Sequence, residues 1–235
     1  MNTPPSSDFK PSAGDTPTPR GNMLRNWVVG LIVVVILLVI AAAILPMILS
    51  GKQNGSLTEA ISNSKGIGLA LFNFAEDYRK YPDATTVDAV RKEDTSHLPL
   101  GTRSSNDFFR QLIAAGYVDN EKLFYANIRG CRKPDGDMRP AHVLEKGECG
   151  FSYILGADGK SNPLRPILVT PLIPGTTRFD PKPFKGFAVI FRLNNSATHE
   201  KINEYGDVID FSGKPLFDPA NPVWGDKPPV IAWPE

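Results

Sequence analysis

The residues best suited to chemistry are two cysteines, Cys131 and Cys149, with His142 between them. Two thiols and one imidazole could form part of a zinc site, but a fourth ligand is missing and the spacing matches no standard zinc finger. A disulfide is the stronger interpretation of this polar loop if it lies outside the cytoplasm. We therefore predict a Cys131–Cys149 disulfide, worth about 3 kcal/mol of stability. Free thiols are the alternative.

Acidic residues offer a second kind of chemistry. Asp135-Gly136-Asp137, Asp158-Gly159 and the pair Asp207 and Asp210 could supply oxygen ligands to Ca²⁺. None of them follows the EF-hand spacing. An Asp-Gly pair is first of all a turn signature. We therefore expect turns at these positions and no metal.

Motifs for catalysis are missing from the sequence. It contains no Gly-x-Ser-x-Gly elbow, no His-Glu-x-x-His and no phosphate-binding Gly-x-x-x-x-Gly-Lys run. His97 and His199 are isolated, and each is expected on the surface. The sequence therefore predicts neither an enzyme nor a bound cofactor.

Composition narrows the possible partners. The 235 residues include 26 Lys and Arg against 25 Asp and Glu, which gives a formal net charge of +1. A balanced charge does not favour binding to nucleic acid, which needs a strongly basic surface. The length is suited to one domain with appendages, because domains cluster near ~100 to 150 residues.

One apolar segment dominates the architecture that we expect. No charged residue occurs between Arg25 and Lys52, and the run from Trp27 to Leu49 is almost wholly Val, Ile, Leu and Ala. At ~1.5 Å per residue such a helix spans a ~30 Å hydrocarbon core. The sequence predicts a transmembrane helix over 25–50, with Arg25, Trp27 and Lys52 at its boundaries. A cleaved signal peptide is the alternative.

The flanks of this segment suggest an orientation. Positive charges before it slightly outweigh those after it, which places the N-terminus in the cytoplasm. The expected location is the inner membrane, crossed once, with residues 51–235 forming a periplasmic domain and the lipid bilayer as one partner. Residues 1–24 are rich in Pro, Ser, Thr and Gly, and they are predicted to be a disordered cytoplasmic tail.

Helices are expected directly after the membrane segment. A polar hinge at 51–55 precedes Ser56-Leu57-Thr58-Glu59, which fits a capping box at the start of a second helix. Tyr81-Pro82 ends that helix, and Gly66 and Gly68 within it indicate close packing against one turn. Its expected apolar face consists of Leu57, Ile61, Ile67, Leu71, Phe74 and Tyr78.

The rest of the chain predicts a small sheet. After a polar connector at 83–103, Ser104 caps a short helix that ends at Gly116, and one further turn runs through Phe124. Short β-rich runs between turn residues then predict a mostly antiparallel sheet, which makes the fold class α+β. A hairpin turn is expected at Asn194-Asn195, and the Pro-rich end is expected to be an extended strap. The predicted strands are 151–155, 167–172, 187–193 and 208–211.

This order of parts is similar to that of type IV pilin-like proteins and type II secretion pseudopilins. The run Ala41 to Pro46, the helix Asn63 to Leu71 and the ending Tyr78 to Pro82 resemble pseudopilin-like proteins of planctomycete and verrucomicrobial genomes. The resemblance covers roughly 45 residues well and the remainder only in layout. It implies a pilin-like fold, and other pilin-like or secretion-system subunits as partners.

The chain also departs from that family. Its members carry a processing site and a glutamate just ahead of the apolar run, where this chain has Gly21 to Asn26 without an acid. This departure does not favour processing or polymerisation. We interpret the sequence as a non-enzymatic, membrane-anchored structural or interaction protein, either a monomer or a minor subunit. A tethered periplasmic enzyme or ligand-binding module is the alternative.

Overall fold

The computed structural model describes residues 20–235, with side chains at 27–42 and 55–235. The chain divides into two units, Met1–Leu49 and Ser50–Glu235. Positions 1–19 of the predicted disordered tail, 1–24, lie outside the described residues. Residues 20–24 are helical instead of disordered. The larger unit contains the described helices α2 and α3 and the sheet, so the folded core belongs to it.

Helix α1 runs from Arg20 to Tyr78 without a break. The predicted hinge at 51–55 is therefore helical, and Ser56 lies buried inside the helix instead of capping it. The helix buries one stripe in the larger unit, at positions three or four apart as expected for one helical face. This stripe includes Ser56, Ala60, Ser64, Ile67, Leu71 and Phe74, and Gly68 and Ala70 beside it are also buried.

The predicted transmembrane helix at 25–50 is wrong. Across the part of the chain that the structure describes, no helix is long and apolar enough to cross a membrane. Two further predictions depended on a transmembrane helix, and they lose their support with it. They are the boundary roles of Arg25, Trp27 and Lys52, and the single-pass inner-membrane location with a periplasmic domain.

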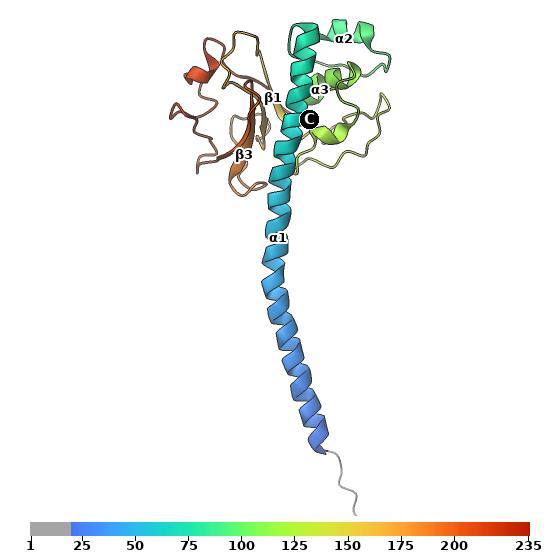
Figure 1. Ribbon diagram of the computed structural model, residues 1–235, viewed down its shortest axis with the longest axis vertical. Helices are drawn as coiled ribbons and strands as arrows, with labels where there is room; N and C mark the ends of the chain where they lie inside the picture. The colour runs from blue at the N-terminus through green and yellow to red at the C-terminus, as the bar shows by residue number, and fades with distance from the viewer. Residues whose placement is uncertain (1–19) are drawn as a thin grey trace, which may run out of the picture. The chain divides into compact units, whose positions relative to one another are not determined.

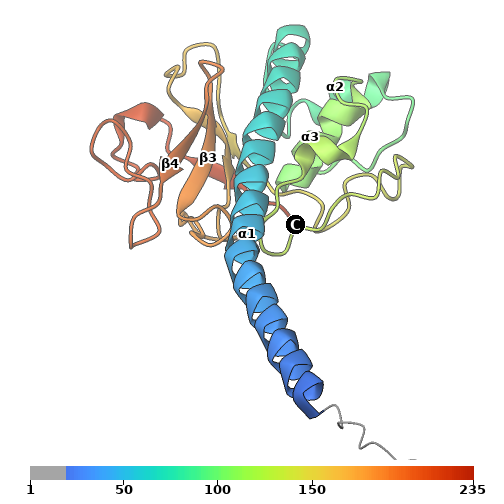
Figure 2. The same cartoon turned by 60° about the horizontal axis from the view of Figure 1, so that its bottom comes forward.

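The larger unit is α+β, with a five-stranded antiparallel sheet in the order β4-β3-β2-β1-β5. In Figures 1 and 2 this sheet lies on one side of the C-terminal part of α1, with helices α2 and α3 on the other side. The strands are β1 Ser152–Leu155, β2 Pro166–Thr170, β3 Phe187–Arg192, β4 Ala197–Lys201 and β5 Val230–Ala232.

Three of the predicted strands correspond to β1, β2 and β3. The fourth, at 208–211, forms only isolated bridges, Ile202 with Val208 and Ile209 with Pro215. The actual edge strand β4 follows the predicted turn, where Asn195 adopts a positive φ of 62°. Strand β4 was missed because its sequence, Ala-Thr-His-Glu-Lys, is mostly polar, as is common on an exposed edge.

The helices after α1 begin within the predicted connector. Helix α2, Val87–Glu93, occupies part of that segment and was not predicted. Helix α3, Ser105–Ala114, begins as predicted at Ser104, whose side chain accepts a hydrogen bond from the Asp107 amide in a capping box. A 3-10 turn, η1 at Glu121–Phe124, follows, as predicted for this segment.

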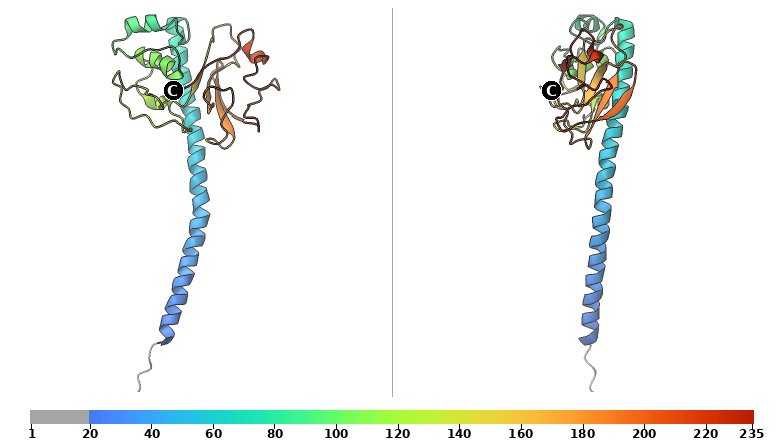
Figure 3. Two further views of the ribbon diagram at one scale, coloured as in Figure 1. Left: turned by 180° about the vertical axis from the view of Figure 1, so that it is seen from behind. Right: turned by 90° about the vertical axis from the view of Figure 1, so that its left-hand side faces the viewer.

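Both faces of the sheet are covered. One face packs against α1 and α3 through Leu71, Phe74 and Phe109. The other face is covered by the Pro-rich C-terminal region, which includes η2 at Pro222–Trp224. There Trp224 stacks on Phe217 with ring centroids 5.9 Å apart and donates to the Leu216 carbonyl over 2.7 Å. The expected strap is therefore a second core layer, and Figure 3 shows this region from two further sides.

Close packing explains Gly66 and Gly68 of α1, as predicted. A Cβ at Gly68 would lie 2.0 Å from Cζ of Phe191, a fully buried residue of β3. A Cβ at Gly66 would lie 2.5 Å from a terminal methyl of Leu123. The helix therefore approaches the sheet at Gly68 more closely than a side chain would allow, and it approaches the flexible end of Leu123 at Gly66.

Candidate functional site

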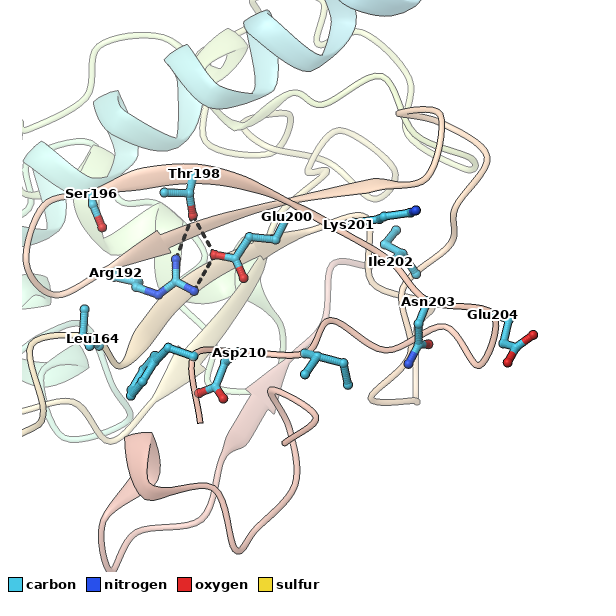
Figure 4. Close-up of a pocket in the computed structure, with 12 residues that line it drawn as sticks. Leu164, Arg192, Ser196, Thr198, Glu200, Lys201, Ile202, Asn203, Glu204 and Asp210 are labelled. Carbon is cyan, nitrogen blue, oxygen red and sulfur yellow. Dashed lines mark hydrogen bonds and ion pairs between the residues drawn. The ribbon is translucent and has the colours of Figure 1, made fainter. Parts of the chain in front are cut away.

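A pocket of ≈900 Å³ lies between the β3–β4 hairpin and the loop 202–211. Figure 4 shows its two walls, with Arg192, Thr198 and Glu200 on the hairpin and Asp210 on the loop. The side chains that decide its chemistry are Arg192, Thr198, Glu200, Asn203, Asp210 and Phe211. The sequence did not predict a site here, although Asp210 was considered as a Ca²⁺ ligand.

The hairpin wall holds a fixed ion pair. Arg192 ends β3, and its guanidinium donates to Thr198 over 2.8 Å and to Glu200 over 2.6 Å. Thr198 and Glu200 are two positions apart on β4, so they lie on the same face of the strand. The Arg192 side chain is buried, and its charge is balanced by Glu200. The Arg192–Glu200 pair therefore adds no net charge to this wall, which also carries the exposed Lys201.

The opposite wall carries an unsatisfied acceptor. Oδ1 of Asp210 accepts hydrogen bonds from the amide and hydroxyl of Ser212, at 2.8 and 2.5 Å. Its Oδ2 is buried and has no hydrogen-bond partner in the described part of the chain. A buried acceptor without a donor is costly, so a bound water or a ligand hydroxyl would stabilise it.

Apolar groups flank these polar ones. Phe211, on the rim, is 66% exposed, and Ile209 beside it is also exposed. Ser196, the other hydroxyl in the lining besides Thr198, donates to Asn194 instead of to a base. Among the lining residues there is no histidine or cysteine. The arrangement can bind a small polar molecule, and the Thr198 hydroxyl in it donates to the Glu200 carboxylate over 2.9 Å.

The two cysteines predicted to pair are free thiols in this structure. Cys149 is buried, and this burial raises the pKa of its thiol to about 12. Burial also raises the pKa of the Cys131 thiol, which is partly exposed. Both residues line one pocket of ≈440 Å³ beside Gly147. Because the two cysteines share a pocket, their pairing stays a prediction.

The other residues considered from sequence have ordinary roles. His142 pairs with Glu145 through Nδ1 at 2.9 Å, and no contact joins it to a thiol among the described residues. His97 and His199 are exposed, as expected. Asp158 forms the predicted turn, because its Oδ1 accepts from the Lys160 amide over 2.9 Å.

Asp135 behaves differently from the other turn residues. It forms a turn through the Asp137 amide, at 2.8 Å. Its carboxylate also approaches those of Glu121 and Glu148 closely enough for one oxygen of each to share a metal ion. Neither glutamate was considered from the sequence, because they are far apart along the chain and neither belongs to a motif. Across the described residues, this is the arrangement of side chains best suited to hold a metal.

Comparison with known proteins finds no relative for this chain. No protein-family model matches it, and neither a curated protein nor a solved structure matches at a significant level.

Proposed function

We propose that this chain is a non-enzymatic structural or interaction protein of the pilin-like kind, which joins an assembly through residues 27–42 of α1. The observation that carries this proposal is the exposure of that segment. Every described residue in it is exposed, it contains no charged residue, and it consists almost entirely of Val, Ile and Leu. A contiguous apolar surface of this kind marks an interaction site.

The partner that best fits this segment is the same segment of other copies. A helix that is apolar on all sides must be covered on all sides. Helix pairing along a single seam would cover only one stripe, so we expect a bundle in which each helix has several neighbours. The order of parts that resembles pilin-like proteins supports the same interpretation, although the family's glutamate is missing here.

The experiment compares two leucines on the same helix. Leu37, in the apolar segment, is 60% exposed, and Leu69, in the larger unit, is 58% exposed. We expect the full chain to sediment as an oligomer, Leu37→Asp to sediment as a monomer, and Leu69→Asp to behave like wild type. A monomeric wild-type chain at tens of micromolar, or equal effects of both variants, would contradict the proposal.

The pocket favours a second candidate function, a ligand-binding module. The observation behind it is the unpaired Asp210 carboxylate oxygen beside the exposed ring of Phe211. A carboxylate acceptor next to an aromatic face suits a neutral compound with several hydroxyl groups, such as a saccharide.

A panel of mono- and disaccharides would test this candidate by NMR. We expect a binder to shift the amide signals of residues 196–211 in the wild-type chain and to bind Asp210→Ala at least tenfold more weakly. Asp207→Ala is the matched control, because Asp207 is not among the pocket residues. If no sugar shifts these signals at millimolar concentration, the candidate fails.

A further inference from the structure

Three carboxylates converge beneath the loop that joins Cys131 to Cys149. One oxygen from each of Glu121, Asp135 and Glu148 lies within 4.8 Å of the others. Glu121 and Glu148 have exposed fractions of 0%, whereas Asp135 is exposed. Two ionisable side chains are thus fully buried next to each other, with a third at the surface of the cluster.

Backbone donors hold the two buried carboxylates in place. Glu121 accepts from the amide of Gly136 through Oε1 and from the amide of Leu144 through Oε2, both at 2.8 Å. Glu148 accepts from the Glu145 amide through Oε2 at 2.7 Å. Because these donors come from both arms of the loop, the carboxylates are fixed before any ligand arrives.

The positive charge near these groups is small. Oε1 of Glu148 is buried and accepts no hydrogen bond. Its neighbouring cation is Arg132, with Nη2 at 3.2 Å, but that guanidinium is half exposed and also binds Glu145. Burial, together with the nearby Glu121 and Asp135, raises the pKa of Glu148. Buried charges need more compensation than a shared, solvated guanidinium gives.

We propose that Glu121, Asp135 and Glu148 bind a divalent cation, with Ca²⁺ the best fit. The donors are all carboxylate oxygens, which hard cations prefer over the nitrogen and sulfur ligands favoured by zinc. Fixed carboxylates and an exposed third ligand fit a cation that enters from the Asp135 side and completes its coordination with water. The site matches no EF-hand pattern, which explains why the sequence did not predict it.

Calorimetry on the chelator-treated full-length chain tests the site. We expect CaCl₂ to release or absorb heat with one site per chain and to raise the thermal unfolding midpoint. Asp135→Asn should weaken binding at least tenfold without loss of folding, because the side chain is exposed. Asp137→Asn is the matched control and should bind within twofold of wild type, because Asp137 pairs with Arg139 outside the cluster.

A second variant distinguishes cation binding at the cluster from protonation of Glu148. Glu148→Gln keeps the shape and removes the buried charge, so we expect it to unfold at a higher temperature than wild type in chelator and to gain nothing from Ca²⁺. The proposal is overturned if neither Ca²⁺ nor Mg²⁺ at millimolar concentration produces heat or shifts the wild-type midpoint. It is equally overturned if Asp135→Asn binds Ca²⁺ as tightly as wild type.

Discussion

The two described parts of α1 use the same kinds of residue in opposite ways. In 27–42 every large apolar side chain is exposed. In 56–78 the buried positions repeat every three or four residues, and Leu69 is the one large apolar side chain that is clearly exposed. The second part stabilises the fold of its own unit, whereas the first part contributes nothing to a core within the described structure. Hydrophobicity alone therefore does not determine whether a helical segment is buried in the core of its own unit.

The largest effect expected on folding comes from Phe74→Ala. Phe74 is fully buried in α1, stacks on Tyr78 with centroids 4.3 Å apart and meets Tyr117 edge-on at 5.9 Å. Removing a buried phenylalanine ring costs ~3 to 5 kcal/mol. Urea unfolding followed by circular dichroism measures the loss. A cost below about 1 kcal/mol would show that this part of α1 does not anchor the core.

Gly68→Ala is the next largest change. The new methyl group would collide with the buried Phe191 ring, and such overpacking costs ~1 to 3 kcal/mol. Gly66→Ala is the matched control, because it meets only the end of the flexible, partly buried Leu123, and the gain in helix propensity of up to ~1 kcal/mol offsets the contact. Equal unfolding free energies for the two variants would refute this account of the close approach.

A change in pH should affect folding stability, which involves the second part of α1, differently from association through the first part. Tyr117 donates a hydrogen bond to Asp77 of α1, and burial together with this bond raises the pKa of Tyr117 to about 12. A tyrosine whose pKa is raised on folding stabilises the fold below its unfolded value near ~10, and that stability is lost as pH rises towards the folded value.

We therefore expect the unfolding free energy to fall between pH 10 and 12, and to fall less in Tyr117→Phe. Residues 27–42 contain no titratable side chain, so self-association of the folded chain should not change from pH 6 to pH 9. Denaturant titrations between pH 10 and 12 measure the unfolding free energy, and sedimentation from pH 6 to pH 9 measures self-association. If Tyr117→Phe loses as much unfolding free energy at alkaline pH as the wild-type chain, a group other than Tyr117 causes the loss.

The smallest effect on folding is expected for Leu37→Asp. An exposed side chain outside any core typically changes the unfolding free energy by no more than ~0.5 kcal/mol. The same variant should show the greatest loss of association. Calorimetric unfolding of the monomeric variant measures the change in unfolding free energy. A drop of several kcal/mol would mean that 27–42 belongs to the folding core after all.

Local signals in the sequence predicted much of this fold. Ser104 and Asp107 form a capping box that is complete within four residues, and Asn194-Asn195 is a turn that needs no distant partner. The buried stripe of α1 was only partly predicted, because the small residues Ala60 and Ser64 are fully buried while the larger Leu57 and Ile61 are only partly covered. Helix contacts of this kind select small residues, which a count of large apolar side chains overlooks.

The candidate sites were much less predictable. Asp210 was noticed as an acid, but its missing hydrogen-bond partner appears only when the loop 202–211 lies against the hairpin. Glu121 and Glu148 come together because η1 and the start of β1 are neighbours in the fold, as the hydrogen bond from the Gly150 amide to the Phe124 carbonyl shows. Contacts between distant segments depend on tertiary packing, and a single sequence carries no direct signal for them.

The most direct measurement of the central claim is photo-crosslinking within the assembly. A photo-reactive amino acid replaces Leu37 in one preparation of the full chain and Leu69 in another. Packed helices lie with their axes about 8 to 10 Å apart, well within reach of such a probe. Assembly through residues 27–42 predicts covalent dimers, at twice the 25.7 kDa chain mass, for position 37 and none for position 69. Dimers at position 69 alone, or at neither position, would contradict assembly through residues 27–42.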